Sequence, residues 1–110
     1  LAAPAGMTMI EPVGYTDMIA LVKNAAFVLT DSGGLQEETS ALNVPCLTLR
    51  NETERPITVE IGTSEITGLD RAKILDAVDR VLSGRWKQGA LHPLWDGRAA
   101  ERIADILRSA

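Results

Sequence analysis

The sequence contains one cysteine, Cys46, and one histidine, His92, among its 110 residues. A lone cysteine cannot form an internal disulfide, and one residue of each kind falls short of a zinc-binding set. Cys46 stands in an apolar, strand-like run, which predicts a buried and inert thiol. No carboxylate or nucleophile accompanies His92 in a recognisable pattern, so we interpret it as structural. We therefore expect no metal and no cofactor.

Positive charge is also scarce. The 11 Lys and Arg residues are outnumbered by 15 Asp and Glu residues, and the net charge is −4. Nucleic acids and acidic membranes both require a basic face, so we expect neither as a partner. The sequence has no apolar run near the ~20 residues that span a bilayer, and no signal-peptide pattern. These absences predict a cytoplasmic protein.

The remaining composition is that of an ordinary globular domain, with 45% hydrophobic and 24% charged residues. A chain of 110 residues can enclose one hydrophobic core but is too short for two domains. It begins at Leu1 rather than at a methionine, and we expect it to be a segment of a longer protein.

Short apolar runs alternate with amphipathic segments along the chain. We predict strands at residues 7–10, 27–30, 44–49 and 65–67, and helices at residues 16–24, 34–42 and 70–83, with a short helix from Pro56 and a last helix after Asp96. This alternation predicts an α/β fold, in which a Rossmann-like parallel sheet with right-handed crossovers carries helices on both faces.

Single residues mark the ends and connections of these elements. We expect Trp86 and Trp95 to pack the connection before the last helix rather than to stack on a ligand. Short polar side chains that can bond to the backbone are typical of helix ends. The predicted N-caps are Thr16, Asp70 and Asp96, and the predicted left-handed helix stop is Asn43.

The most informative stretch covers residues 30–38, with the sequence TDSGGLQEE. It follows a predicted strand and opens a predicted helix, an arrangement that aims free backbone N–H groups at an anion. Two glycines remove side chains where the chain turns and let another molecule approach, and the Ser32 hydroxyl adds a donor. Carboxylates one turn into the helix suit sugar hydroxyls beyond a phosphate. The stretch predicts a site for a phosphorylated sugar or a nucleotide.

A Gly-Gly pair between a strand and a helix is also compatible with nothing more than a tight turn. Neither G-x-G-x-x-G nor the P-loop pattern G-x-x-x-x-G-K-[ST] is present. On these residues alone both interpretations stay open, and the rest of the chain must decide between them.

A second polar segment, residues 50–56 (RNETERP), follows the next predicted strand. Ligands of open α/β sheets bind beyond the carboxyl ends of the strands, so we expect this segment at the same sheet edge as Ser32. Pro56 restricts the backbone of Arg55, whose planar guanidinium suits a phosphate. Glu52 and Glu54 are also compatible with a merely solvated face.

Together these features resemble the non-hydrolysing UDP-N-acetylglucosamine 2-epimerases. The order and spacing of several motifs carry the resemblance, which covers nearly the whole chain from about Ile10 onward. These motifs are TDSGGLQEE at 30–38, Val44-Pro45, Arg50, TERP at 53–56, Gly62-Thr63, the capped helix at Asp70, His92-Pro93 and Asp96-Gly97.

The resemblance implies a two-domain glycosyltransferase-B fold, in which residues 1–110 are the C-terminal, UDP-binding, Rossmann-like domain and the N-terminal catalytic domain is absent. Members interconvert UDP-N-acetylglucosamine and UDP-N-acetylmannosamine. They remove the proton at C2, expel UDP by anti elimination to a glycal, and re-add UDP with protonation on the opposite face. The acid/base carboxylates and a phosphate-contacting histidine belong to the N-terminal domain. The segment alone should therefore bind UDP weakly and catalyse nothing.

The same resemblance divides the labour within residues 30–38. It implies that Ser32, Gly33 and Gly34 contact the diphosphate of UDP. It implies that Glu38 holds the ribose hydroxyls, and it leaves Glu37 without a role.

Three further residues are assigned by the resemblance. Arg55 falls where the family has an arginine facing the nucleotide-sugar. Val13 and Met18 fall where the family contacts uracil, but other members commonly carry different side chains there, such as an aromatic one. We therefore expect only backbone or apolar contact from these two residues. The family also commonly forms homodimers.

Two other interpretations remain open. The chain could be the UDP-sugar-binding domain of a hydrolysing epimerase or of a glycosyltransferase with the same fold, or a non-catalytic nucleotide-binding module. The sequence that precedes this segment in the full protein would discriminate between them, because only an epimerase carries the epimerase carboxylates there.

Overall fold

The computed structural model describes residues 4–90 and 92–110 of the chain. A three-stranded parallel sheet has the order β1-β2-β3, with β1 (Val28–Thr30), β2 (Cys46–Thr48) and β3 (Ser64–Ile66). The helices, in chain order, are α1 (Tyr15–Lys23), α2 (Gly33–Leu42), α3 (Pro56–Glu60), α4 (Arg71–Leu82) and α5 (Ala99–Ser109). Val28 pairs with Cys46 and Cys46 with Ser64, so corresponding strand positions are aligned across the sheet.

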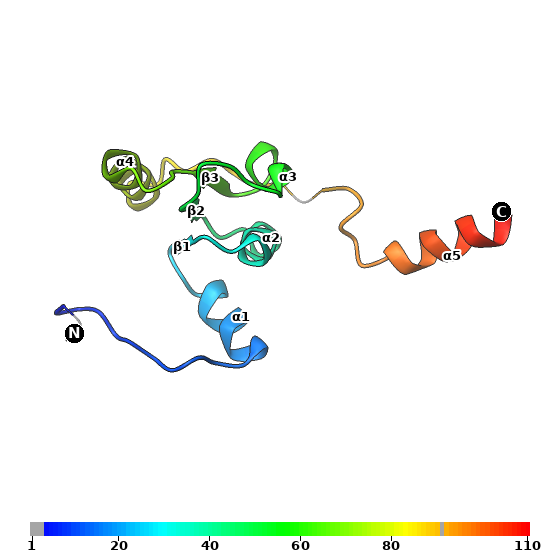
Figure 1. Ribbon diagram of the computed structural model, residues 1–110, viewed down its shortest axis with the longest axis horizontal. Coiled ribbons are helices and arrows are strands. Elements are labelled where there is room, and N and C mark those ends of the chain that lie inside the picture. The colour runs from blue at the N-terminus through cyan, green and yellow to red at the C-terminus, as the bar shows by residue number, and fades with distance from the viewer. Residues whose placement is uncertain (1–3, 91) are drawn as a thin grey trace.

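Helices cover both faces of the sheet. Figure 1 shows α2 and α3 on one side of the strands and α4 on the other, and α1 contacts α2. The middle strand β2 is buried along its whole length, with Cys46 and Leu47 inaccessible to solvent. The α/β fold and the buried thiol predicted from the sequence are both confirmed.

Local signals place three of the helix ends as predicted. Asp70 caps α4 by accepting hydrogen bonds from the backbone N–H groups of Ala72 at 2.9 Å and Lys73 at 3.2 Å. Asn43 ends α2 in the left-handed conformation, with φ 57° and ψ 41°. Pro56 is the first residue of α3. The N–H groups of the first helical turn have no acceptor within the helix, so proline, which lacks an N–H, loses no hydrogen bond there.

The predicted strand at residues 7–10 is wrong. Met7, Met9 and Ile10 are 58%, 74% and 61% exposed, and Figure 1 shows the N-terminal segment standing clear of the sheet. A strand needs a neighbour that completes its backbone hydrogen bonds. No strand among the described residues lies beside this segment, so an apolar run alone does not make it a strand.

Two predicted N-caps are also wrong. The helix α1 begins one residue before Thr16, with Gly14 as its N-cap and no side-chain cap. The helix α5 begins at Ala99, and Asp96 instead forms an ion pair with Arg102 at 2.9 Å. Hydrogen bonds from Arg102 hold the pKa of Asp96 below its ordinary value. Residue type alone predicts a cap at Thr16 and at Asp96. The backbone conformation decides at which residue each helix starts, and it places the N-caps at Gly14 and Arg98.

The connection after α4 packs back onto the sheet. Trp86 donates a hydrogen bond from Nε1 to the carbonyl oxygen of Thr63 at 2.9 Å, and the guanidinium of Arg80 lies 5.1 Å from the centre of its ring. The ammonium group of Lys87 donates to two backbone carbonyls, and burial lowers its pKa. Trp86 is therefore the packing residue that the sequence predicts.

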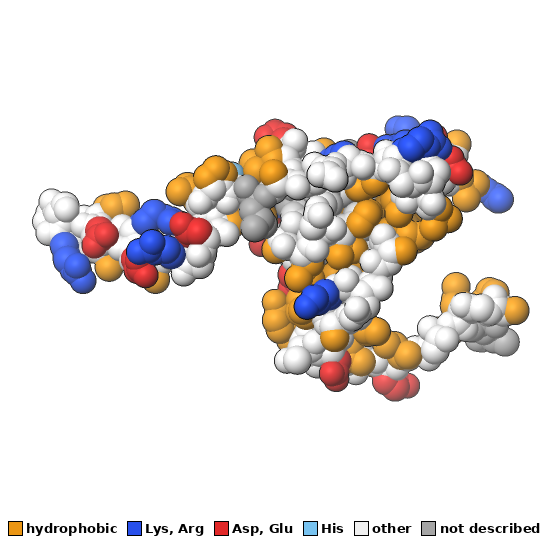
Figure 2. All heavy atoms as spheres, turned by 180° about the vertical axis from the view of Figure 1, so that it is seen from behind, with side chains coloured by type: hydrophobic (Ala, Val, Ile, Leu, Met, Phe, Trp, Pro, Cys, Tyr) orange, Lys and Arg blue, Asp and Glu red, His pale blue; other side chains and the backbone are white. Residues whose placement is uncertain are grey.

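The last helix, α5, stands apart from the sheet and its covering helices (Figure 1), and the longest dimension of the chain is 59 Å. Its apolar stripe includes Ile103, Ile106 and Leu107, which are 58%, 69% and 69% exposed. Figure 2 shows hydrophobic side chains on the surface of the central body as well. Within the described part of the chain, no helix has the length and apolar character that crossing a membrane requires.

Gly62 marks a point of very close packing between α3 and α2. A methyl group there would lie 2.5 Å from the carbonyl oxygen of Thr58 and 2.9 Å from its Cα. We expect Gly62→Ala to lower the free energy of unfolding by about 1–3 kcal/mol, as overpacking does. Chemical denaturation measures the change. Gly14→Ala is the control, because nothing lies within 4 Å of its added methyl group, and an equal loss in both variants would contradict this explanation.

Candidate functional site

The segments that follow β1 and β2 meet at the carboxyl edge of the sheet. A methyl group built on Gly33 would lie 3.8 Å from Cγ of Arg55 and 3.9 Å from its Cζ. The Arg55 side chain therefore runs alongside the start of α2. This confirms the prediction that the two polar segments share one sheet edge.

Ser32 is the N-cap of α2. Its Oγ accepts a hydrogen bond from the N–H of Leu35 at 3.4 Å, and its own N–H donates to Oγ1 of Thr30 at 3.0 Å. The amides of Gly33 and Gly34 come next and have no acceptor within residues 4–90 and 92–110. Free N–H groups at a helix start, reinforced by the helix dipole, form a binding position for an anion.

The turn itself does not require the two glycines. Neither Gly33 nor Gly34 has a positive φ, and a methyl group on either would meet its nearest neighbour at 3.8 Å, an ordinary contact. Glycine at these positions leaves the backbone uncovered at the helix end. The sequence suggests two reasons for this pair. The first, a turn that only glycine can make, is wrong. The second, an open approach of another molecule to the backbone, stays a prediction.

Both the backbone and the guanidinium of Arg55 are held in place. Arg55 is the N-cap of α3, and its Nε forms an ion pair with the carboxylate of Glu37 in α2. Its Nη1 makes only long contacts with Glu54, at 3.5 Å to the carbonyl and 4.0 Å to the carboxylate. The outer edge of the guanidinium is therefore open to another acceptor. No local pattern in the sequence signals the pairing of Arg55 with Glu37.

Glu38 lies one helical turn beyond Gly34 and is half-buried. It borders a hollow of about 220 Å³ between α1 and α2, whose other walls are Tyr15, Ile19, Ala41 and Leu42. A carboxylate beside apolar walls is typical of a ligand site in which a few polar groups orient a mostly apolar contact. Tyr15 and Ile19 are missing from the sequence-based assignment, although their i, i+4 spacing places them on one helix face.

Trp95 also lies near Glu38. It borders a second hollow with Glu37, Glu38 and Ala41, and it is 37% exposed. The centre of its ring lies 6.3 Å from the centre of the His92 ring. Nδ1 of His92 accepts a hydrogen bond from the N–H of Leu94 at 3.0 Å. The local contact of His92 is compatible with the predicted structural role, and the prediction that Trp95 packs the connection stays a prediction, although its ring borders this hollow.

The structure does not gather Val13 and Met18 around Glu38. Val13 lines a hollow on the opposite face of α1, together with Ile10, Asp17, Ala20, Leu21 and Asn24. Met18 belongs to α1 and is half-buried, but it does not line the hollow beside Glu38. The residues of α1 that stand beside Glu38 are Tyr15 and Ile19. The assignment of Val13 and Met18 to uracil stays a prediction.

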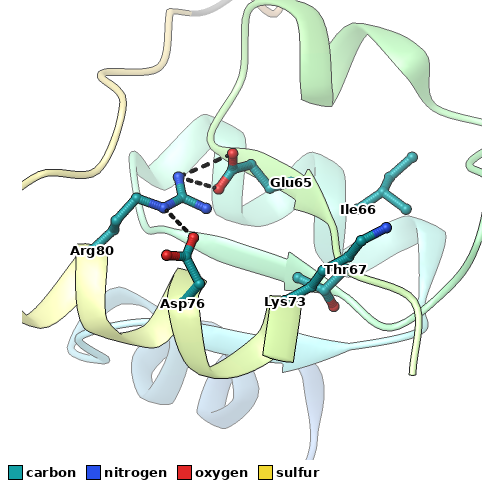
Figure 3. A pocket seen from close by; sticks show the side chains of 6 residues that line it. All are labelled: Glu65, Ile66, Thr67, Lys73, Asp76 and Arg80. Carbon is teal, nitrogen blue, oxygen red and sulfur yellow. Dashed lines mark hydrogen bonds and ion pairs between the residues drawn. The ribbon is translucent and has the colours of Figure 1, made fainter. Parts of the chain in front are cut away.

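A separate hollow of about 200 Å³ lies on the α4 face of the sheet, and Figure 3 shows the charged side chains that line it. Arg80 forms ion pairs with Glu65 at 2.9 Å and with Asp76 at 3.0 Å. Burial acts to lower the pKa of Arg80, but the hydrogen bonds and charges of the two carboxylates outweigh it and raise the pKa. Lys73 also lines the hollow, so two cations face the two carboxylates. The cluster joins α4 to β3 and is a weaker candidate for a ligand site.

Comparison with known proteins gives a consistent result. The sequence model of the UDP-N-acetylglucosamine 2-epimerase family matches residues 1–108. The UDP-N-acetylglucosamine 2-epimerase of Methanocaldococcus jannaschii is 48% identical to this chain over 101 residues, which are 90% of this chain and 26% of that protein.

Solved structures agree with the sequence comparison. A crystal structure of the M. jannaschii enzyme in complex with UDP-GlcNAc and UDP superposes with a TM-score of 0.74 at 47% identity, over 92% of this chain and 27% of that one. The enzyme of Neisseria meningitidis, bound to UDP-GlcNAc, has a TM-score of 0.74 at 30% identity, over 92% and 29%. The chain thus spans between a quarter and a third of the length of these relatives.

Proposed function

Because this chain belongs to the UDP-N-acetylglucosamine 2-epimerase family, we propose that it is the C-terminal domain that holds UDP in a two-domain enzyme of that activity. The observation that carries the proposal is that the Arg55 side chain runs beside Gly33 at the carboxyl edge of the sheet, where the amides of Gly33 and Gly34 begin α2. Relatives of known structure bind UDP-GlcNAc and UDP, and the site has donors suited to their phosphates.

In this proposal the diphosphate lies over the start of α2. The amides of Gly33 and Gly34 and the hydroxyl of Ser32 donate to phosphate oxygens, and the outer edge of the Arg55 guanidinium donates from the side. Glu38 is one turn further along α2, about 6 Å from Gly34 along the helix axis. This separation is comparable with that between the diphosphate and the ribose hydroxyls, so Glu38 accepts from the ribose.

The uracil then extends toward α1. The hollow beside Glu38 has the apolar walls Tyr15 and Ile19, which suit a flat ring. Met18 of α1 would contribute backbone or apolar contact, whereas Val13 precedes α1 and lines the hollow on its opposite face, so its contact with uracil is the weaker part of the assignment. This part of the proposal rests on the position of Glu38 relative to α1.

The local charge balance predicts that this segment alone binds UDP weakly. Arg55 is the cation that runs beside the start of α2, and its Nε is already paired with Glu37. Several carboxylates lie close in sequence or in space and oppose an anion: Asp31, Glu37, Glu38 and Glu54. Additional donors must therefore come from the rest of the protein, which we propose is an N-terminal catalytic domain.

Exposed apolar surface supports a partner of this kind. The stripe of Ile103, Ile106 and Leu107 on α5 is uncovered, and so is Leu29 of β1, which is 46% exposed. Apolar side chains in such number are usually covered in a complete protein. We propose that the remainder of the enzyme supplies this cover, with a homodimer as an alternative source.

The chemistry that we propose for the full enzyme explains the role of these donors. Removal of the C2 proton and anti elimination expel UDP, so negative charge grows on the diphosphate as the transition state forms. Donors already aimed at that charge lower the barrier. This segment would stabilise the leaving group, while the carboxylates that move the proton belong to the other domain.

Titration with UDP tests the proposal, and Glu38 sharpens it. We expect UDP to bind this chain weakly, with a dissociation constant on the order of a millimolar, and the full-length protein more tightly. Glu38→Ala should weaken UDP about tenfold, because a ribose hydroxyl loses a charged acceptor. It should leave the affinity for inorganic diphosphate within about twofold. Calorimetry or chemical-shift titration provides both values.

Two results would count against the proposal. If neither this chain nor the full-length protein bound UDP, the site would be misassigned. If Glu38→Ala weakened UDP and inorganic diphosphate equally, Glu38 would not be the ribose acceptor.

A further inference from the structure

Gln36 is 1% exposed, although glutamine is a polar residue that usually lies at the surface. Its backbone N–H closes the first turn of α2 by donating to the carbonyl oxygen of Ser32 at 3.4 Å. Its side chain leaves the helix toward the segment that follows β2. Gln36 therefore contacts both halves of the proposed diphosphate site.

The amide oxygen of Gln36 meets two threonine hydroxyls from that segment. Oγ1 of Thr53 donates to Oε1 of Gln36 at 2.7 Å, and Oγ1 of Thr58 lies 3.2 Å from the same atom. Thr58 is fully buried and Thr53 is partly buried, so water competes little for these contacts. The amide oxygen thus accepts a hydrogen bond from Thr53 and lies against the hydroxyl of Thr58, whose proton goes to the carbonyl oxygen of Arg55.

The same two hydroxyls hold the backbone of Arg55. Oγ1 of Thr53 accepts a hydrogen bond from the N–H of Arg55 at 2.9 Å, and Oγ1 of Thr58 donates to its carbonyl oxygen at 2.7 Å. Both main-chain polar groups of Arg55 are therefore held by side chains that Gln36 itself contacts. The guanidinium leaves the chain from a backbone that is fixed on both sides.

We propose that Gln36 is a positioning residue, which sets the place of the Arg55 guanidinium relative to the Gly33 and Gly34 amides. The inference rests on the proposed UDP-binding function. Without the amide oxygen, the segment keeps the ion pair between Arg55 and Glu37 but loses the hydrogen bond from Thr53 to α2, and the guanidinium samples more positions. Binding a diphosphate must then order Arg55 at a larger cost in conformational entropy.

We expect Gln36 to contribute little to stability, and this makes the inference testable. Its Nε2 is buried without a hydrogen-bond partner among the described residues. The desolvation cost of that donor offsets the gain at Oε1. Gln36→Met keeps a similar length and removes both the acceptor and the unpaired donor. We therefore expect the variant to fold normally, so that a loss of binding does not reflect a loss of structure.

A double-mutant cycle in the full-length protein tests whether Gln36 acts through Arg55. The affinity for UDP is measured by calorimetry for the wild type, Gln36→Met, Arg55→Ala and the double variant. We expect Gln36→Met to weaken UDP about tenfold when Arg55 is present and less than about twofold when it is absent, since coupled residues do not add. Equal losses in both backgrounds would overturn the inference. If the wild type bound no UDP, the proposed function would fail first and the inference with it.

Matched threonine variants give an independent readout. Thr53→Val removes the hydroxyl that joins Gln36 to Arg55, whereas Thr53→Ser keeps it, so only the first should weaken UDP. Thr39→Val is the control, because its buried hydroxyl bonds only to carbonyls of its own helix, at 2.8 Å and 3.1 Å. It should change thermal stability and leave the affinity unaltered. Loss of affinity in Thr53→Ser, or in the control, would indicate a general structural effect and contradict the inference.

Discussion

Gly34→Ala is expected to remove most of the affinity for UDP while making the chain more stable. A Cβ in a helix tilts toward the helix N-terminus, so the new methyl group would project into the space over the free amides where we propose that the diphosphate binds. Loss of two charge-assisted hydrogen bonds costs about 3 kcal/mol or more, which is roughly a hundredfold in affinity. The folded chain has room for the methyl group, 3.8 Å from Oγ of Ser32.

The gain in stability separates this effect from misfolding. Alanine in place of glycine stabilises a helix by about 0.5–1 kcal/mol. Calorimetric titration with UDP and chemical denaturation measure the two effects on one sample. Arg71→Ala in α4 is the control, because it introduces alanine near the start of another helix and should leave the affinity unchanged. A Gly34→Ala variant that bound UDP as the wild type does would show that the helix end is only a turn.

Arg55→Ala is expected to lower the turnover of the full-length protein in the proposed epimerase reaction by about a hundredfold to a thousandfold, the usual effect of losing a donor aimed at developing charge. The Michaelis constant should rise much less. The reason is that the diphosphate carries more negative charge on the expelled UDP than on the intact nucleotide-sugar. An interaction made mainly in the transition state therefore appears in the turnover number.

Two further variants complete this measurement. Arg55→Lys should recover only part of the activity, because a point charge replaces a fork that pairs with Glu37 and, in the proposed site, also reaches the phosphate. Arg85→Ala is the control, since Arg85 forms a comparable surface ion pair with Asp79 at 2.7 Å, far from this site in the fold. A rise in the Michaelis constant with unchanged turnover would show that Arg55 binds the ground state and the transition state equally.

Much of the site follows from signals within a few residues of one another. A short apolar run, a Ser-Gly-Gly turn and helix formers are enough to predict a helix start that faces an anion. The order of strands and helices then places the Arg55 segment at the same edge. The sequence predicts that these two segments lie near each other, because parallel strands bring their carboxyl ends to the same edge of the sheet.

The sequence by itself determined the α/β class, the family, the caps at Asp70 and Asn43, and the segments that meet at the carboxyl edge of the sheet. These depend on local conformational preference and on the alternation of elements, which the chain carries in neighbouring residues.

Tertiary structure alone decided which side chains join those segments. Glu37 pairs with Arg55 across 18 positions, and Gln36 reaches Thr53 and Thr58 across 17 and 22 positions. It also decided that residues 7–10 form no strand, for want of a neighbouring strand. Contacts of this length depend on how α2, β2 and α3 are placed relative to one another, and no local preference encodes that placement.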